Sequence, residues 1–147
     1  MAGLNVQAQT AAIAVGNPKT ILQIVAPTNQ RLKVNEWSVS FTGTSNTDAP
    51  VKVDIMRQST AGTMSALTLV KKNSDDAETI QSTAQHTATV EPTSGDIVRT
   101  EYVHPQTGYT WQAPFGKEIP VKGGERLAMR ITSALSINVV GTFEYEE

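Results

Sequence analysis

The sequence predicts an all-β fold: a two-sheet antiparallel sandwich with jelly-roll topology and an extended N-terminal arm. Short apolar–polar alternations recur along the chain, and turn residues such as Gly, Pro and Asn separate them. The chain contains 19 threonines, a β-branched residue that favours strands and tolerates a half-exposed sheet face. No helical period is long enough for a parallel α/β sheet, and long crossovers between some strands favour a Greek-key jelly roll.

The length predicts one domain with one core, because a chain of 147 residues does not support two independent cores. We expect residues 1–15 to form the N-terminal arm and residues 16–147 to form a single sandwich domain. Residues 1–10 are small and polar, which favours a flexible segment, and residues 11–15 (AAIAV) predict a short strand that ends at a Gly-Asn-Pro turn.

Alternation predicts most of the other strands. The expected strands, in chain order, are 11–15, 20–25, 31–42, 51–57, 66–71, 87–90, 96–104, 109–112, 118–122, 125–132 and 136–145. Within residues 31–42 the apolar phase shifts by one residue between Val34 and Trp37. A shift of one residue turns side chains to the opposite face, so we expect a β-bulge near Asn35 and Glu36 to restore one inward face.

The later strands show the clearest two-residue period. Residues 51–57 place Val51, Val53 and Ile55 on one face, and Lys52 and Asp54 are expected to face outward. In the last two strands the inward face is predicted to carry Leu127, Met129 and Ile131, and then Ile137, Val139, Gly141, Phe143 and Tyr145.

Turn residues mark the connections. Residues 43–50 and 59–64 are predicted turns, and Gly123-Gly124 predicts a tight turn that permits positive φ. Residues 73–86 carry too few apolar side chains for a core helix. We expect a loop with one helical turn there, capped by Ser74 or Asp75.

The composition disfavours several classes of function. The net charge of −2 argues against direct nucleic-acid binding, which needs an excess of Lys and Arg. The chain has no cysteine, so it has neither disulfides nor a thiolate metal site. The first residues lack the pattern of a secretory signal, and the apolar runs are too short to span a membrane, so no membrane contact is expected.

Candidate catalytic and metal-ligating residues are not found. The two histidines, His86 and His104, lack the His-x-His arrangement of jelly-roll metalloenzymes, and Glu101 would point away from His104 on the same strand. No Gly-x-Ser-x-Gly elbow and no Gly-rich phosphate loop occur. We therefore expect no enzyme activity, no metal and no cofactor.

Two sets of residues are candidates for binding. The arm residues Asn5, Val6, Ile13 and Val15 could add a strand to the sheet edge of a neighbouring subunit, and the alternative is a disordered tail.

The other set is an aromatic pair. Tyr109 and Trp111 lie two residues apart on one predicted strand and share a face, which is the arrangement of a sugar-binding platform. The chain has few aromatic residues, so a place in the core is the alternative for Trp111.

Residues 20–147 resemble the jelly-roll decoration, or cement, proteins of tailed bacteriophages. The segments that carry the resemblance are strands and turns: residues 34–41, 49–53, 60–64, 91–93, 104–106, 111, 115–119 and 123–127. The resemblance implies a homotrimer that binds the major capsid protein on the virion surface, after synthesis in the host cytoplasm. In this reading residues 2–15 would reach a neighbour. The alternative is a carbohydrate- or receptor-binding module of a phage fibre or tail, since such modules share this architecture.

Overall fold

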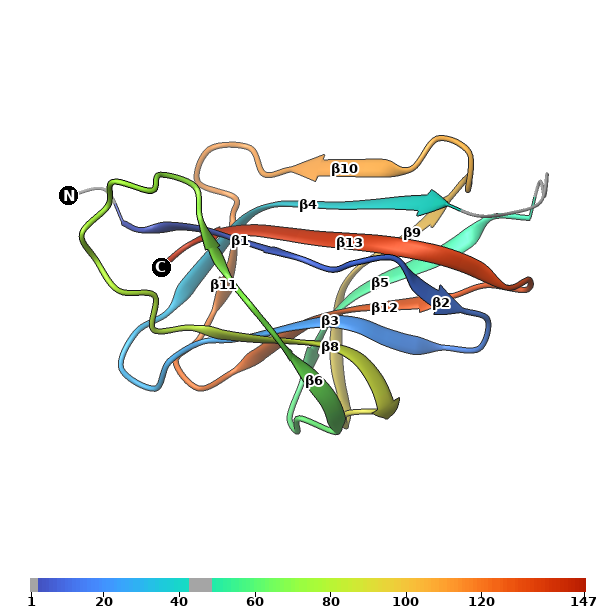
Figure 1. Cartoon of the computed structure of the whole chain (residues 1–147), viewed down its shortest axis with the longest axis horizontal. Helices are drawn as coiled ribbons and strands as arrows, with labels where there is room; N and C mark the ends of the chain where they lie inside the picture. Colours follow the sequence, from blue (N-terminus) through green and yellow to red (C-terminus); the bar gives the residue numbers. More distant parts are fainter. Residues whose placement is uncertain (1–2, 43–48) are drawn as a thin grey trace.

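Two antiparallel sheets face each other as a sandwich in the computed structural model, which describes residues 3–42 and 49–147 (Figure 1). The described part of the chain is all β and contains no helix. Its strands are β1 (Asn5–Gln9), β2 (Ile13–Val15), β3 (Lys19–Val25), β4 (Leu32–Thr42), β5 (Val51–Gln58), β6 (Thr63–Leu67), β7 (Val70–Lys71), β8 (Thr83–Val90), β9 (Ser94–Val103), β10 (Tyr109–Gln112), β11 (Ile119–Val121), β12 (Arg126–Thr132) and β13 (Ile137–Glu146).

The strand order mixes early and late segments of the chain. Sheet A has the order β10-β4-β13-β1-β7, with β11 beside β4 and β2 beside β13. Sheet B has the order β6-β8-β3-β12-β5-β9. The chain crosses repeatedly from one sheet to the other, as from β3 to β4 to β5 and from β12 to β13. This order is compatible with a jelly roll. Of the predicted turn at residues 43–50, residues 43–48 lie outside the described residues.

The core lies between the two sheets and follows the predicted two-residue period. Along β13 every second residue is buried, from Ile137 to Tyr145. Across the core, Leu127, Met129 and Ile131 of β12 are also buried. The side chains of Ile21 and Met129 come so close to Gly141 that a Cβ there would lie 2.8 Å from Ile21 Cδ1. Both inward faces predicted for the last two strands are confirmed.

The β-bulge predicted in β4 is present. Glu144 lies opposite Glu36 and Tyr145 lies opposite Val34, so Asn35 is an extra residue on β4. The bulge lets Val34 and Trp37 both point into the core, where each is fully buried.

The described part of the expected N-terminal arm lies inside the sandwich. β1 pairs with β13 of the same chain from Asn5–Glu146 to Gln9–Thr142, and β2 pairs with β13 farther along. The side chains of Val6, Ala8, Ile13 and Val15 are buried. This corrects the expectation of a flexible segment outside the domain. The physical reason is the alternation of Leu4, Val6 and Ala8, which supplies inward side chains to the sheet.

Asp54 also departs from expectation, because its side chain is buried on the outer face of sheet B. β5 lies between β12 and β9, and side chains from both neighbours cover it. The Thr100 hydroxyl donates a hydrogen bond of 2.7 Å to one carboxylate oxygen, and Arg130 Nη2 lies 3.4 Å from the other. The position of β5 between two other strands therefore makes an outward-facing residue a buried, paired one.

Asp54→Asn is expected to lower the free energy of unfolding by about 1–2 kcal/mol, because hydrogen bonds to a charged group contribute roughly 1.5–3 kcal/mol and Arg130 is partly exposed. Urea unfolding measures this, with the exposed Asp96→Asn as the matched control. Equal stability of the two variants would show that the Asp54 contacts contribute nothing.

The segment between β5 and β9 differs from the prediction in detail. β6 extends into the predicted turn at residues 59–64. No helical turn forms within residues 73–86. Instead the Asn73 side chain accepts the Asp75 N–H at 3.1 Å and donates to Asp76 Oδ1 at 2.9 Å. These side-chain bonds close a turn and compete with the helix that Ser74 or Asp75 was expected to cap.

Candidate binding sites

The predicted aromatic pair lies on β10 at the edge of sheet A. Tyr109 and Trp111 share a face, and that face points toward the core, against which both side chains are partly buried. The Tyr109 and Trp37 rings are 5.3 Å apart between centroids. Arg99 lies 5.9 Å from the Trp111 ring centroid and donates to the Tyr109 hydroxyl at 3.2 Å. The pair therefore packs against the core, which was the alternative expected for Trp111.

The four arm residues with a predicted partner contact have different surroundings. Val6, Ile13 and Val15 are buried against their own chain. Asn5 is exposed at the start of β1, and its carbonyl accepts the Lys72 N–H at 2.9 Å. The structure brings all four to β13 or β7 of the same chain.

A hydroxyl and carboxylate cluster holds the C-terminal residue. Ser82 Oγ lies 2.7 Å from the Tyr145 hydroxyl and also donates to Glu147. The Ser82 N–H donates to the same carboxylate at 3.1 Å. Burial raises the pKa of the Tyr145 hydroxyl far above its ordinary value, so this group stays protonated. These contacts attach Glu147, which follows β13, to Ser82, which precedes β8. We therefore interpret the cluster as structural and not as a serine nucleophile with an oriented base.

Neither a cluster of metal-ligating side chains nor a long apolar helix occurs among the described residues. Residues 3–42 and 49–147 contain no group of three or more His, Cys, Asp or Glu side chains that could hold a metal ion. The same residues contain no helix that is long and apolar enough to cross a membrane.

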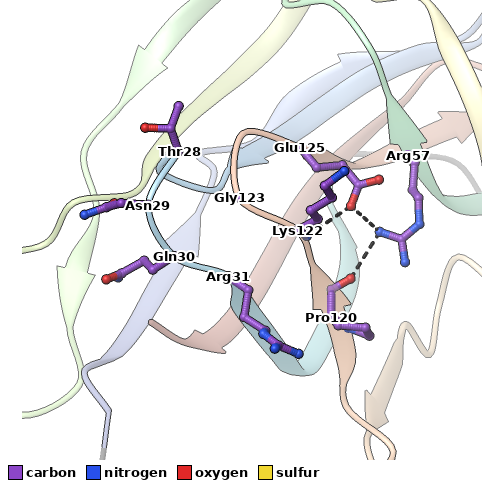
Figure 2. Close-up of a pocket in the computed structure, with 9 residues that line it drawn as sticks. All are labelled: Thr28, Asn29, Gln30, Arg31, Arg57, Pro120, Lys122, Gly123 and Glu125. Atoms are coloured by element: carbon purple, nitrogen blue, oxygen red, sulfur yellow. Dashed lines mark hydrogen bonds and ion pairs between the residues drawn. The ribbon is translucent and has the colours of Figure 1, made fainter.

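A cavity of about 670 Å³ opens at one end of the sandwich, and we call it the end pocket (Figure 2). It lies between the β3–β4 connection, the β11–β12 connection and the C-terminal end of β5, which contributes Arg57. Its volume falls in the range of small-ligand sites, roughly 300–1,000 Å³. The residues that line it are mostly polar: Thr28, Asn29, Gln30, Arg31, Arg57, Pro120, Lys122, Gly123 and Glu125.

Two glycines let the walls of the end pocket come together. A Cβ on Gly123 would lie 2.8 Å from the Thr28 carbonyl oxygen, closer than a side chain permits. Gly124 has a φ of 81°, which favours glycine, and its N–H donates to the Ala26 carbonyl at 3.1 Å. The predicted Gly123-Gly124 turn is confirmed, and it brings the two connections into contact.

One carboxylate, that of Glu125, lines the end pocket and is paired with a cationic group of the same pocket. Arg57 Nη1 donates to Glu125 Oε2 at 2.9 Å and to the Pro120 carbonyl at 3.1 Å. The Lys122 N–H donates to the same carboxylate oxygen at 3.1 Å. Figure 2 shows this ion pair on the side of the pocket away from Arg31.

Two cationic groups of the end pocket are left without a counterion. Arg31 and Lys122 are exposed. Among the described residues, neither the Arg31 guanidinium nor the Lys122 ammonium group has a hydrogen-bond or ion-pair partner. With Arg57 and Glu125 included, the lining carries three positive charges and one negative charge.

A second candidate surface lies on β9, an edge strand of sheet B that pairs only with β5 among the described strands. Three of its apolar side chains are exposed: Ile97 by 49%, Val98 by 40% and Tyr102 by 65%. We call these residues the β9 patch. Val98 is an extra residue in the pairing with β5, because Ile97 lies opposite Met56 and Arg99 lies opposite Ile55. This β-bulge interrupts the alternation of inward and outward side chains at Val98.

Sequence reasoning found the strands of both surfaces but missed the surfaces. The end pocket combines residues from three separate segments, and only its Gly123-Gly124 turn was visible in the sequence. For the β9 patch a signal exists, because Ile97 and Val98 are adjacent apolar residues and cannot both follow a strict two-residue period.

Comparison of the chain with family models, with curated proteins and with solved structures finds no match.

Proposed function

We propose that the protein is a virion structural protein, a decoration protein that binds the outside of a bacteriophage capsid shell and stabilises it. The observation that supports this most is the β9 patch, which leaves apolar side chains in water on a sheet edge and offers a contact through which protomers of a trimeric decoration protein could associate. Apolar side chains grouped on a free sheet edge are typical of surfaces that bind another polypeptide. The resemblance of residues 20–147 to jelly-roll decoration proteins supports the choice of partner.

In this proposal the protein acts by binding, with no chemical step and no cofactor. The packaged genome presses outward on a capsid, and the shell fails when its subunits separate. A protein that bridges neighbouring major capsid subunits opposes this, because separation must then break its contacts as well. A homotrimer presents each contact three times, so weak contacts combine through avidity. Neither nucleic acid nor membrane takes part.

The test of the function is binding to expanded empty capsids of the phage that encodes the chain. Purified protein is mixed with the capsids and sedimented, and saturable binding at threefold or quasi-threefold positions is the expected result. Electron microscopy of the bound shells locates the sites. Absence of saturable binding would contradict the proposal.

The β9 patch is expected to form the contact between protomers. Ile97→Lys/Tyr102→Lys places two charges in that contact, so the trimer should become a monomer in light scattering. Both side chains are exposed, and the unfolding midpoint should change little. Thr110→Lys, at an exposed position of sheet A, is the control and should remain trimeric. A double variant that stays trimeric would exclude the patch as the contact.

A further inference from the structure

The end pocket recognises one carboxylate within its own chain, and this shows the chemistry that its walls offer. Glu125 receives a guanidinium N–H from Arg57 at 2.9 Å and a backbone N–H from Lys122 at 3.1 Å. Charge-assisted N–H donors of this kind are the usual partners of carboxylates in proteins. The pocket is thus built from groups that bind anions.

The remaining groups leave an excess of positive charge. The four charged lining residues, three cations and one anion, carry a net charge of +2. The whole chain carries −2, so the rest of the molecule carries −4. The end pocket is therefore a positive site on a negative protein. An anionic group in it would complement Arg31 and Lys122, which have no counterion among the described residues.

The size and lining of the end pocket favour an extended ligand over a single small ion. A volume of about 670 Å³ accommodates several residues of a peptide. Asn29 and Gln30 also line the end pocket, and Figure 2 shows their amide side chains directed away from Glu125 and Arg57. Figure 2 shows Arg31 and Arg57 on either side of Pro120, with Lys122 and Glu125 close by, so several cationic groups line this part of the pocket.

From these observations we propose that the end pocket is a binding site for an acidic polypeptide segment, with Arg31 and Lys122 as the residues that bind its carboxylates. Arg57 is already paired with Glu125 and with the Pro120 carbonyl, and these contacts fix one wall of the end pocket. This inference does not rest on the proposed function, because the end pocket and the β9 patch are different surfaces made of different residues.

The experiment titrates the full-length protein with a terminally blocked hexaglutamate peptide at low ionic strength and measures heat or amide chemical shifts. Hexaglutamine of the same length, inorganic phosphate and a short thymidine oligonucleotide are the other arms. We expect saturable binding of hexaglutamate that weakens as salt is added. We expect no saturable binding in the other three arms.

Matched lysine variants locate the site. Lys122→Gln and Lys117→Gln remove the same charge from exposed positions, and only Lys122 lines the end pocket. The double variant Arg31→Gln/Lys122→Gln should bind hexaglutamate about tenfold more weakly, and Lys117→Gln should bind like the unchanged protein. Circular dichroism confirms that each variant is folded.

Four results would overturn the inference. They are absence of hexaglutamate binding, equal affinity of the double variant and the unchanged protein, equal loss in Lys117→Gln and Lys122→Gln, and saturable binding of phosphate or oligonucleotide in preference to the peptide. The first three exclude the site, and the last assigns it to a different anion. None of these results bears on capsid binding, so the inference and the proposed function fail separately.

Discussion

Removal of residues 2–15 is expected to leave no stably folded domain. This deletion takes away β1 and β2, which pair with β13 along much of its length. It also removes the buried side chains of Leu4, Val6, Ile13 and Val15. Full burial of an aliphatic side chain contributes about 1.5–3 kcal/mol, so the four together contribute about 6–12 kcal/mol. The whole stability of a domain is about 5–15 kcal/mol, so the loss is comparable to all of it.

Circular dichroism and urea unfolding of the truncated chain test this expectation. The sandwich should lose its cooperative transition and its characteristic strand signal. Two point variants separate the role of burial from that of chain length. Val6→Asp puts a charge into the core and should destabilise strongly, and Gln9→Asp at an exposed position of β1 should not. A truncated chain that unfolds cooperatively at the original midpoint would show that the segment is a dispensable arm after all.

Leu127→Ala is expected to lower the free energy of unfolding by about 2–5 kcal/mol, the usual cost of emptying a leucine site in a packed core. Leu127 has 0% exposure and lies on β12, between β3 and β5 in the middle of sheet B. Its neighbours are fixed in the ladder, so the cavity cannot collapse completely.

Leu135→Ala makes the same chemical change at a residue that is 48% exposed, and it is the matched control for this prediction. Urea unfolding of both variants should show a large loss for Leu127 and a change near zero for Leu135. Similar losses in the two variants would mean that the inward face of β12 has been assigned to the wrong residues.

The sheets could be read from the sequence wherever a strand has one apolar and one polar face. β13 is the clearest case, because its alternation from Ile137 to Tyr145 matches the observed burial residue by residue. The bulge in β4 was also predictable, since two apolar series one residue out of phase can share a face only if a residue is inserted.

Other features depend on neighbours that the local pattern does not contain. Asp54 reads as a solvent-facing residue, and only the covering strands β9 and β12 make it a buried one. Tyr109 and Trp111 were correctly placed on one face, but alternation does not say whether that face points inward. β1 reads as a polar tail, because Asn5, Gln7 and Gln9 dominate its composition.

The candidate binding sites depend even more on contacts between distant segments, which the local sequence pattern does not contain. The end pocket exists because Gly123 lets two connections approach, and because a β5 side chain, Arg57, reaches the same place. These contacts join residues tens of positions apart, and no local sequence pattern encodes them. The β9 patch has a signal in the sequence, because Ile97 and Val98 are adjacent apolar residues, but its place at a sheet edge follows only from the strand order.

The start of β1 and the end of β13 lie side by side in the structure. The Leu4 N–H donates to the Glu147 carbonyl at 3.1 Å, and the Glu147 N–H donates to the Leu4 carbonyl at 2.9 Å (Figure 1). Because β1 and β13 are antiparallel, a pull on the two ends would load their hydrogen bonds one after another and unzip the pair. A pull along the strands from opposite ends of the sandwich would instead load many bonds at once. Tension is thus resisted least when it is applied at Leu4 and Glu147.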